Sequence, residues 1–318
     1  MNHNTNDERL QDLRANGKPR PWKEKKLANE LLVKSFLRLG EVSKAERASN
    51  CSLWLQFEQE MDTNKKRLKR AVFCRERLCP MCQWRKSLRV FAEVSRVMDE
   101  AQRRYADLDP VFLTLTVKNC LGDDLYGTVD KMQNAWNILL NHRQIKGQVK
   151  GWFRALEVTI SERDGSYHPH FHVIMLFDKG YFKADNAKYI GIEKWVYLWR
   201  LSMKLDYDPV CDIRKIRTND GKHKAVAEVA KYAVKDAQYL SKDEEKTDER
   251  VGTLGVALYK RRLWAFGGIL KKIAKELGVE RPEDGDLINI GGEIREDIAT
   301  VIIQYNWGFG AGDYIRKR

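Results

Sequence analysis

The chain has 318 residues, enough for one large hydrophobic core or two smaller ones. Its 58 Lys and Arg residues exceed its 45 Asp and Glu residues, and the resulting formal charge of +13 predicts a polyanionic partner, nucleic acid first of all. No apolar run is long enough to span a bilayer and the polar start resembles no secretory signal, so we expect a cytoplasmic protein without a membrane partner, whose six cysteines are reduced or metal-bound.

The first 45 residues are expected to form a basic arm followed by a helix. The pattern over 22–39 places apolar side chains at roughly helical spacing, and Gly40 is expected to end the helix. The apolar positions assigned to its buried face are Leu27, Leu31, Phe36 and Leu39.

A cysteine-rich module is expected over 46–106. Cys74, Cys79 and Cys82 follow one another as C-x4-C-x2-C, and Cys51 precedes them at a longer spacing. Two thiolates of a C-x2-C turn can bind one ion, and a second pair from a neighbouring segment can complete a tetrahedral zinc site. The alternative is that some of these residues are ordinary buried thiols.

Basic residues surround these cysteines. Between Lys65 and Arg89 the chain carries ten basic residues and one acid, Glu76. Such a run is often only a solvated face, but next to a metal module in a basic chain it favours a surface that contacts DNA phosphates. An amphipathic helix over 83–105 is expected to leave the module.

The region 107–240 alternates strand and helix patterns and is expected to be one catalytic domain. Strands are predicted from apolar alternation and helices from a period of 3.6 residues. The expected strands are 111–118, 152–160, 167–177 and 209–217, and the expected helices are 127–142 and 193–203.

One of these strands carries two histidines one residue apart. Side chains at i and i+2 of a strand point to the same face, so His170 and His172 can bind one cation together. The alternative is a pair of core histidines. His168 has the same parity, but Pro169 predicts that the strand begins only after it. The packing face is assigned to Phe171, Val173, Met175 and Phe177.

Glu157 lies on the strand expected to pair beside the histidine strand. Its carboxylate could complete the ligand set of the metal, or it could face solvent on a sheet edge.

A helix is predicted over 225–240. Glu228, Tyr232, Lys235 and Tyr239 fall on the face opposite its apolar stripe, so the Tyr232 phenol is bracketed by a possible base and a cation. An exposed face with no chemistry is the alternative. The apolar stripe consists of Val226, Val229, Ala230, Ala233, Ala237 and Leu240.

The charged segment 241–250 is expected to be a linker at a domain boundary. The C-terminal region, 251–318, has no assigned role. It contains an expected helix over 264–277 and a strand over 300–307.

Three motifs in this order resemble those of the HUH endonucleases and, within them, the rolling-circle replication initiators of small Gram-positive plasmids. They are F-L-T-L-T (112–116), H-P-H-F-H (168–172) and E-V-A-K-Y-A-V-K (228–235). A looser resemblance extends to F-C-R-E-R-L-C-P-M-C (73–82) and R-R-L-W-A-F-G-G (261–268).

The resemblance implies an α+β fold, with a central antiparallel sheet flanked by helices and a cysteine and zinc module on its N-terminal side in the sequence. It implies that Tyr232 is a nucleophile and that His170 and His172 hold Mg²⁺ or Mn²⁺. Glu157 occupies a position like that of the acidic third metal ligand of the family, and Glu228 occupies the position where a general base is expected.

The implied activity is cleavage of one strand of a double-strand origin through a 5′-phosphotyrosine, which leaves a 3′-hydroxyl primer, with later strand transfer. The implied partners are origin DNA, both double-stranded and extruded single-stranded, a host helicase and a DNA polymerase. Two alternatives remain open: a zinc-stabilised DNA-binding regulator without enzyme activity, and a relaxase or transposase of the same superfamily.

Overall fold

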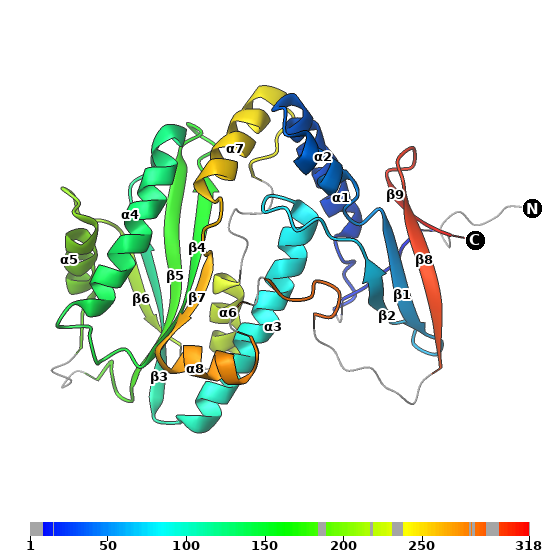
Figure 1. Ribbon diagram of the computed structural model, residues 1–318. Coiled ribbons are helices and arrows are strands. Elements are labelled where there is room, and N and C mark those ends of the chain that lie inside the picture. Colours follow the sequence, from blue (N-terminus) through cyan, green and yellow to red (C-terminus); the bar gives the residue numbers. More distant parts are fainter. Residues whose placement is uncertain are drawn as a thin grey trace, which may run out of the picture. The chain divides into compact units, whose positions relative to one another are not determined.

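The structure is a computed structural model of the chain (Figure 1). It describes residues 9–14, 16–183, 189–216, 219–230, 238–279, 281, 284–290 and 299–317, with the backbone alone for 219–223. The chain forms two compact units. Unit 1 comprises Met1–Lys86, Leu240–Gly252 and Asp286–Arg318, and unit 2 comprises Ser87–Tyr239 and Thr253–Gly285.

Helices and strands alternate along the described chain. The helices are α1 (Trp22–Arg38), α2 (Val42–Ser49), α3 (Pro80–Arg104), α4 (Gly122–Asn141), α5 (Ile192–Met203), α6 (Asn219–Val229), α7 (Glu244–Ala257) and α8 (Gly268–Glu276). The strands are β1 (Trp54–Glu60), β2 (Lys66–Ala71), β3 (Leu108–Thr116), β4 (Gly151–Ile160), β5 (Tyr167–Asp178), β6 (Cys211–Lys215), β7 (Trp264–Gly267), β8 (Thr300–Gly308) and β9 (Asp313–Arg316).

Unit 1 is built on a four-stranded antiparallel sheet in the order β2-β1-β8-β9. Strand β8, expected from the sequence, pairs along its length with β1, from Trp54 opposite Asn306 to Glu60 opposite Thr300. Alternate residues of these strands are buried, as expected of a sheet with one covered face. The ring of Trp22 in α1 packs edge-on against Phe57 and Trp84, with centroid distances of 5.8 and 4.7 Å.

Helix α1 has the predicted extent, and Phe36 is buried as predicted, but the three leucines assigned to the same buried face are not. Gly40 adopts a φ of +73° just after the helix, as expected of a glycine that ends one. Leu27, Leu31 and Leu39 are exposed, at 39, 42 and 41 %. Polar side chains on this helix are buried instead, among them Lys26 and Asn29, and they serve the cysteine cluster described below.

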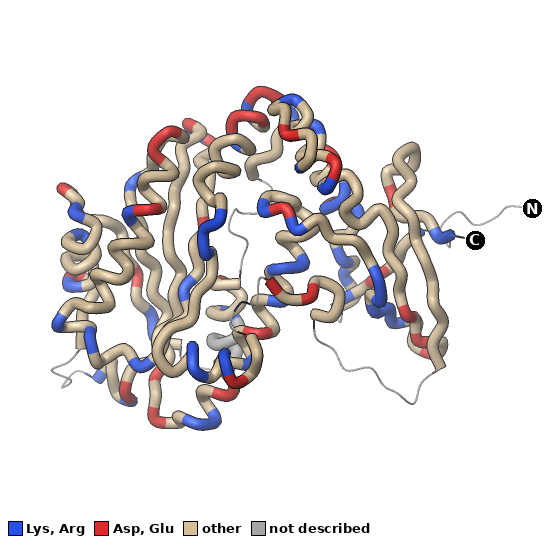
Figure 2. The backbone as a smooth tube through the Cα atoms, in the orientation of Figure 1, with Lys and Arg blue, Asp and Glu red and all other residues tan. Residues whose placement is uncertain are grey.

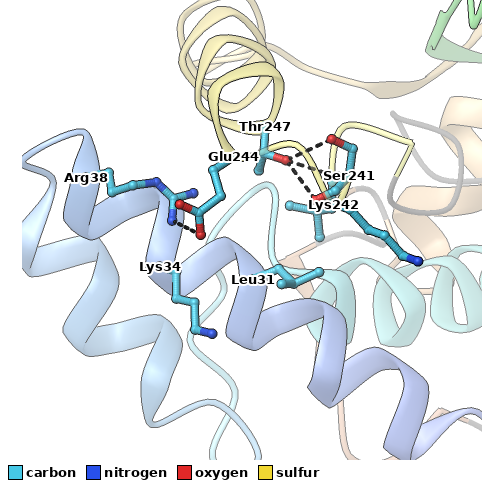
Figure 3. Close-up of a pocket in the computed structure, with 8 residues that line it drawn as sticks. Leu31, Lys34, Arg38, Ser241, Lys242, Glu244 and Thr247 are labelled. Atoms are coloured by element: carbon cyan, nitrogen blue, oxygen red, sulfur yellow. Dashed lines mark hydrogen bonds and ion pairs between the residues drawn. The ribbon is translucent and has the colours of Figure 1, made fainter.

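The segment 241–250 is not a linker, because most of it belongs to α7 and is tied to α1. Thr247 Oγ1 donates to the carbonyl of Ser241, and Arg38 forms an ion pair with Glu244 (Figure 3). Arg38 also forms an ion pair with Asp248. These contacts line a cavity of about 340 Å³ in unit 1. The segment is charged, as the sequence shows, but Glu244 and Asp248 form ion pairs with Arg38 and are not only solvated.

Unit 2 is built on a five-stranded antiparallel sheet in the order β6-β3-β5-β4-β7 (Figure 1). Helices α4 and α5 cover one face, where Phe171 of β5 meets Trp136 and Trp199 at centroid distances of 6.1 Å each. Helix α6 packs on the opposite face, which carries the histidines. The predicted packing face of β5 is confirmed, since all its members are buried: Phe171, Val173, Met175 and Phe177.

Strand β5 begins at Tyr167, before Pro169 rather than after it. Pro169 lies opposite Val158 of β4, whereas the pairing of β5 with β3 stops at His170. The missing amide hydrogen of the proline is therefore not needed on the β3 side, and the strand tolerates it.

The region 251–318 does not form one body. Residues 264–267 form strand β7 at the edge of the five-stranded sheet, where Phe266 lies opposite Phe153 of β4, and the helix begins only at Gly268. The prediction of a helix from residue 264 was therefore wrong. Two glycines allow this turn, since a Cβ at Gly268 would lie 2.2 Å from the carbonyl oxygen of Lys150.

The helix predicted over 225–240 also differs from the observed one. Helix α6 begins earlier, at Asn219, and ends at Val229. Tyr239 is fully buried in a turn, so its assignment to an exposed face was wrong. Tyr232 and Lys235 lie outside the described residues.

The predicted fold class is confirmed: the chain is α+β, with antiparallel sheets flanked by helices and a cysteine cluster towards its N-terminal end. Among the helices of the described residues, none has both the length and the apolar character that crossing a bilayer requires.

Candidate functional site

Strands β4 and β5 bring two histidines and a carboxylate together. His170 and His172 point to the same face of β5, and Glu157 lies directly opposite His170 on β4. His170 Nε2 is 3.1 Å from His172 Nε2 and 3.3 Å from Glu157 Oε2, and His172 Nε2 is 3.2 Å from the same oxygen. Three possible ligand atoms therefore face one point.

The outer nitrogens of both imidazoles are held by the protein. His170 Nδ1 lies 3.1 Å from the carbonyl oxygen of His168, and His172 Nδ1 lies 3.2 Å from Thr114 Oγ1 on β3. A hydrogen on each Nδ1 leaves each Nε2 lone pair directed at Glu157, which is the tautomer a metal ligand needs.

The three side chains are buried, with 5, 7 and 9 % exposure for Glu157, His170 and His172. Burial opposes ionisation of Glu157, but an N–H and a positive charge on each of the two histidines outweigh it and lower the pKa of its carboxyl to about 2. In the tautomer that leaves both Nε2 lone pairs free, a bound metal ion would supply that positive charge instead. The carboxyl therefore ionises easily in this surrounding, and a buried carboxylate requires a positive partner.

This donor set fits a divalent ion. Two ligands bound at about 2.1 Å and at roughly right angles are about 3.0 Å apart, close to the three separations found here. Glu157, His170 and His172 form a group whose ligand atoms all lie within 4.8 Å of one another. His168 and Glu157 were both candidates for the third ligand, and the group contains Glu157.

Helix α6 adds a second carboxylate. Glu228 Oε1 lies 3.6 Å from His172 Nε2, and its side chain is 36 % exposed. The apolar residues Val226 and Val229 on the same helix are buried, at 1 and 0 %, and fix the helix against the unit. Glu228 thus faces the cluster and solvent at the same time.

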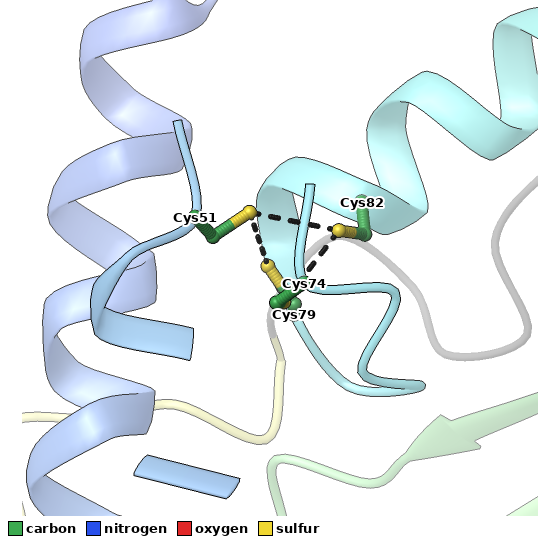
Figure 4. A group of neighbouring side chains, drawn as sticks. All are labelled: Cys51, Cys74, Cys79 and Cys82. Atoms are coloured by element: carbon green, nitrogen blue, oxygen red, sulfur yellow. Dashed lines mark hydrogen bonds between the residues drawn. The ribbon is translucent and has the colours of Figure 1, made fainter. Parts of the chain in front are cut away.

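The four predicted cysteines meet in unit 1 (Figure 4). Cys51 Sγ is 3.6 Å from both Cys79 Sγ and Cys82 Sγ, and Cys74 Sγ is 3.6 Å from Cys82 Sγ. Four thiolates about 2.3 Å from one tetrahedral ion are about 3.8 Å apart, so the cluster has the dimensions of a four-cysteine metal site. Cys51, whose spacing was the least regular, belongs to it.

Helix α1 supplies polar groups to this cluster. Lys26 is 1 % exposed, and its Nζ donates to the carbonyl oxygens of Ser49 and Cys51 at 3.0 and 2.6 Å. Asn29 Nδ2 donates to the Ala48 carbonyl, and its Oδ1 lies 3.1 Å from Cys79 Sγ. Sequence patterns gave no signal for either residue, because both stand on a helix face that reads as solvent-exposed.

The basic stretch divides into structural and surface residues. Arg85 is 5 % exposed and donates to the carbonyl oxygens of Leu287 and Ile288, so it is not available to a phosphate. Lys69 and Arg70 on β2 are exposed, and Figure 2 shows Lys and Arg residues gathered along this strand. Of the stretch predicted to contact phosphates, Lys69 and Arg70 are therefore accessible and Arg85 is not.

Comparison with known proteins places the chain. The model of the family described as "Replication protein" matches residues 65–315. The chain belongs to this family. The match confirms the resemblance to the rolling-circle replication initiators, and it covers both the cysteine cluster from Cys74 onwards and the histidine cluster.

Similar proteins from several bacteria span nearly the whole chain. A protein named "Protein rep" from Bacillus amyloliquefaciens is 37 % identical, over 97 % of this chain and 97 % of its own length. Those of Lactiplantibacillus plantarum and Streptococcus pneumoniae are 33 and 35 % identical, over 96 and 89 % of this chain and 98 and 87 % of their own lengths. No solved structure matches the chain.

Proposed function

We propose that this chain initiates rolling-circle replication of a plasmid by nicking one strand of its origin DNA. The observation that carries this proposal is the meeting of Glu157, His170, His172 and Glu228 within hydrogen-bonding or near-contact distance, at the end of the helix that leads to Tyr232. Helix α6 ends at Val229, and Tyr232 follows three positions later in the sequence.

His170, His172 and Glu157 would hold the catalytic ion. Imidazole nitrogen with carboxylate oxygen suits Mn²⁺ better than Mg²⁺, which prefers oxygen alone, although either can serve. When bound, the ion supplies positive charge for the non-bridging oxygens of the scissile phosphate. Thr114 and the His168 carbonyl hold the two imidazoles in the orientation that this requires.

Tyr232 is the proposed nucleophile. Its phenol oxygen attacks phosphorus, the bond from phosphorus to the 3′ oxygen breaks, and the proton passes to that oxygen, which leaves as a 3′-hydroxyl. The 5′ end stays linked to the tyrosine, so the energy of the phosphodiester is kept for strand transfer. A phenol has a pKa of about 10, and Lys235, three positions further along the sequence, is proposed to favour the phenolate.

Glu228 is the proposed general base for the end of the round. Its carboxylate is half-exposed, so water can reach it, and it faces His172. By taking a proton from water it would hydrolyse the second junction without forming another covalent link. One tyrosine and one carboxylate then allow one round for each protein molecule.

The four cysteines are proposed to bind a structural Zn²⁺, because four thiolates select that ion. Region 46–106 would then contact double-stranded origin DNA through the exposed basic residues of β2, and region 107–240 would cut the extruded single strand. A host helicase and a DNA polymerase are the proposed partners of the 3′-hydroxyl product, and the cytoplasm is the proposed location.

The test is a nicking assay on the supercoiled plasmid that carries the matching origin, with and without Mn²⁺. We expect open-circular product only with Mn²⁺, and a DNA-linked peptide that contains Tyr232 by mass spectrometry. Tyr232→Phe should abolish the link and retain DNA binding. Tyr239→Phe is the matched control, because Tyr239 is buried and should not react. Wild-type protein that binds the origin without cutting it would support a regulator instead.

A further inference from the structure

A pocket opens beside the histidine cluster on the same face of the five-stranded sheet. It has a volume of about 260 Å³ and lies between β3, β6 and α6. Its floor is apolar, formed by Phe112, Ile216 and Ala225, which are 6, 9 and 6 % exposed. Its rim is charged, and consists of Arg214, Lys215, Lys224 and Glu228.

The pocket shares its inner wall with the metal ligands. The Phe112 ring lies 5.6 Å from the His172 ring between centroids, with 34° between their planes. Glu228 lines the pocket and also lies 3.6 Å from His172 Nε2. A molecule in the pocket would therefore be one side chain away from the place where the scissile phosphate is expected.

Two basic side chains, those of Arg214 and Lys224, stand against one acid, Glu228, because Lys215 pairs with Val111 and Asp109 on the other face of the sheet. Arg214 is paired with the exposed Asp212, but a pair of this exposed kind contributes little and can be exchanged for a phosphate. The Lys224 side chain is exposed. The charge balance favours an anionic ligand.

Phe112 on the floor and Arg214 on the rim can stack on the two sides of a flat ring such as a nucleobase. The Arg214 guanidinium lies 5.7 Å from the centroid of the Phe112 ring, across the pairing of β3 with β6. Its side chain is 69 % exposed, so it can move aside and close over an inserted base. Bases stack on aromatic rings and on guanidinium planes regardless of their identity.

We infer that this pocket binds one nucleotide of single-stranded DNA next to the phosphate that is cut, with its base between Phe112 and Arg214 and its phosphate facing Lys224. The volume is below the roughly 300–1,000 Å³ of pockets for drug-sized ligands, so one base fits and a stacked pair does not. A base inside a duplex cannot enter such a pocket. The inference rests on the proposed nickase function, which supplies the strand.

Two variants and one matched control test the pocket. Arg214→Gln removes the covering cation and Phe112→Leu removes the ring while keeping apolar volume. Arg200→Gln is the control, because Arg200 also lies 5.7 Å from an aromatic ring, that of Tyr197, and also pairs with an exposed acid, but stands on α5. Circular dichroism checks that each variant is folded.

The first measurement is fluorescence anisotropy with a fluorescein-labelled random 20-nucleotide single strand in EDTA. We expect Arg214→Gln and Phe112→Leu to weaken binding about tenfold, the loss of one stacked base, and Arg200→Gln to change it less than about twofold. The second is covalent capture from a random single-stranded library with Mn²⁺, followed by sequencing of the linked strands. The yield of linked strand should fall in Arg214→Gln and Phe112→Leu and change less than about twofold in Arg200→Gln, with no change in base preference, because stacking does not depend on the identity of the base.

Equal affinity of the wild type and both pocket variants would overturn the assignment, as would an unchanged yield of linked strand in both pocket variants. If Phe112→Leu does not fold, the exposed Arg214→Gln decides. Wild-type protein that yields no covalent product contradicts the nickase proposal and not the pocket, which the anisotropy measurement still decides.

Discussion

Removing the hydroxyl of Thr114 should loosen the metal site without touching a ligand. Thr114 Oγ1 lies 3.2 Å from His172 Nδ1, and the two residues face each other across β3 and β5. Valine has the same shape but cannot accept the imidazole hydrogen, so Thr114→Val leaves a buried Nδ1 without that partner. Loss of one such bond costs about 0.5–1.5 kcal/mol, and loss of an orienting partner lowers metal affinity about 10- to 100-fold.

The same strand provides the control. Thr116 has the same parity and lies opposite His170, but its hydroxyl donates to the Val210 carbonyl rather than to a histidine. Thr116→Val should cost a similar free energy of unfolding, about 1 kcal/mol, and change Mn²⁺ affinity less than about threefold. Both are measured by calorimetric titration of Mn²⁺ into metal-free protein and by urea denaturation. Equal loss of affinity in the two variants would refute the orienting role of Thr114.

Three further variants test other parts of the molecule. Glu228→Gln should retain the first nick but slow hydrolysis of the second junction about 10²–10⁴-fold, seen as covalent complex that accumulates on denaturing gels. Cys82→Ser should lower bound zinc from one per chain to near zero by mass spectrometry and lower the melting temperature, whereas Cys211→Ser, outside the cluster, should keep the zinc. Lys26→Met leaves two carbonyl oxygens without their donor and should cost about 1–3 kcal/mol in urea denaturation, against almost nothing for the exposed Lys34→Met on the same helix.

Local sequence was enough wherever the relevant geometry repeats along one element. The period of two in a strand places His170 and His172 on one face whatever surrounds them. Glu157 could be proposed as their partner because a short hairpin joins the two strands, and the observed pairing of Ile160 with Tyr167 next to that turn sets Glu157 opposite His170.

Sequence reasoning failed where a distant segment decides the structure. The apolar run W-A-F-G (264–267) suits a helix or a strand, and its pairing with β4 makes it a strand. Strands β1 and β2 were not foreseen, since β1 pairs with residues 300–308 near the other end of the chain. Leu27, Leu31 and Leu39 of α1 were expected in the core, but the structure buries Trp22 and Leu32 there, together with the predicted Phe36.

The sequence by itself determined the chemistry available to this protein: a pair of imidazoles on one strand face, a close set of three cysteines, and a tyrosine shortly after a glutamate. Only the tertiary structure decided which groups assist them. Strand pairing brings Thr114 to His172 and Phe112 to Arg214, and helix packing brings Lys26 to the cysteine cluster. Spacing along a chain fixes the direction of neighbouring side chains, whereas contact between remote segments depends on the burial and pairing of the whole fold.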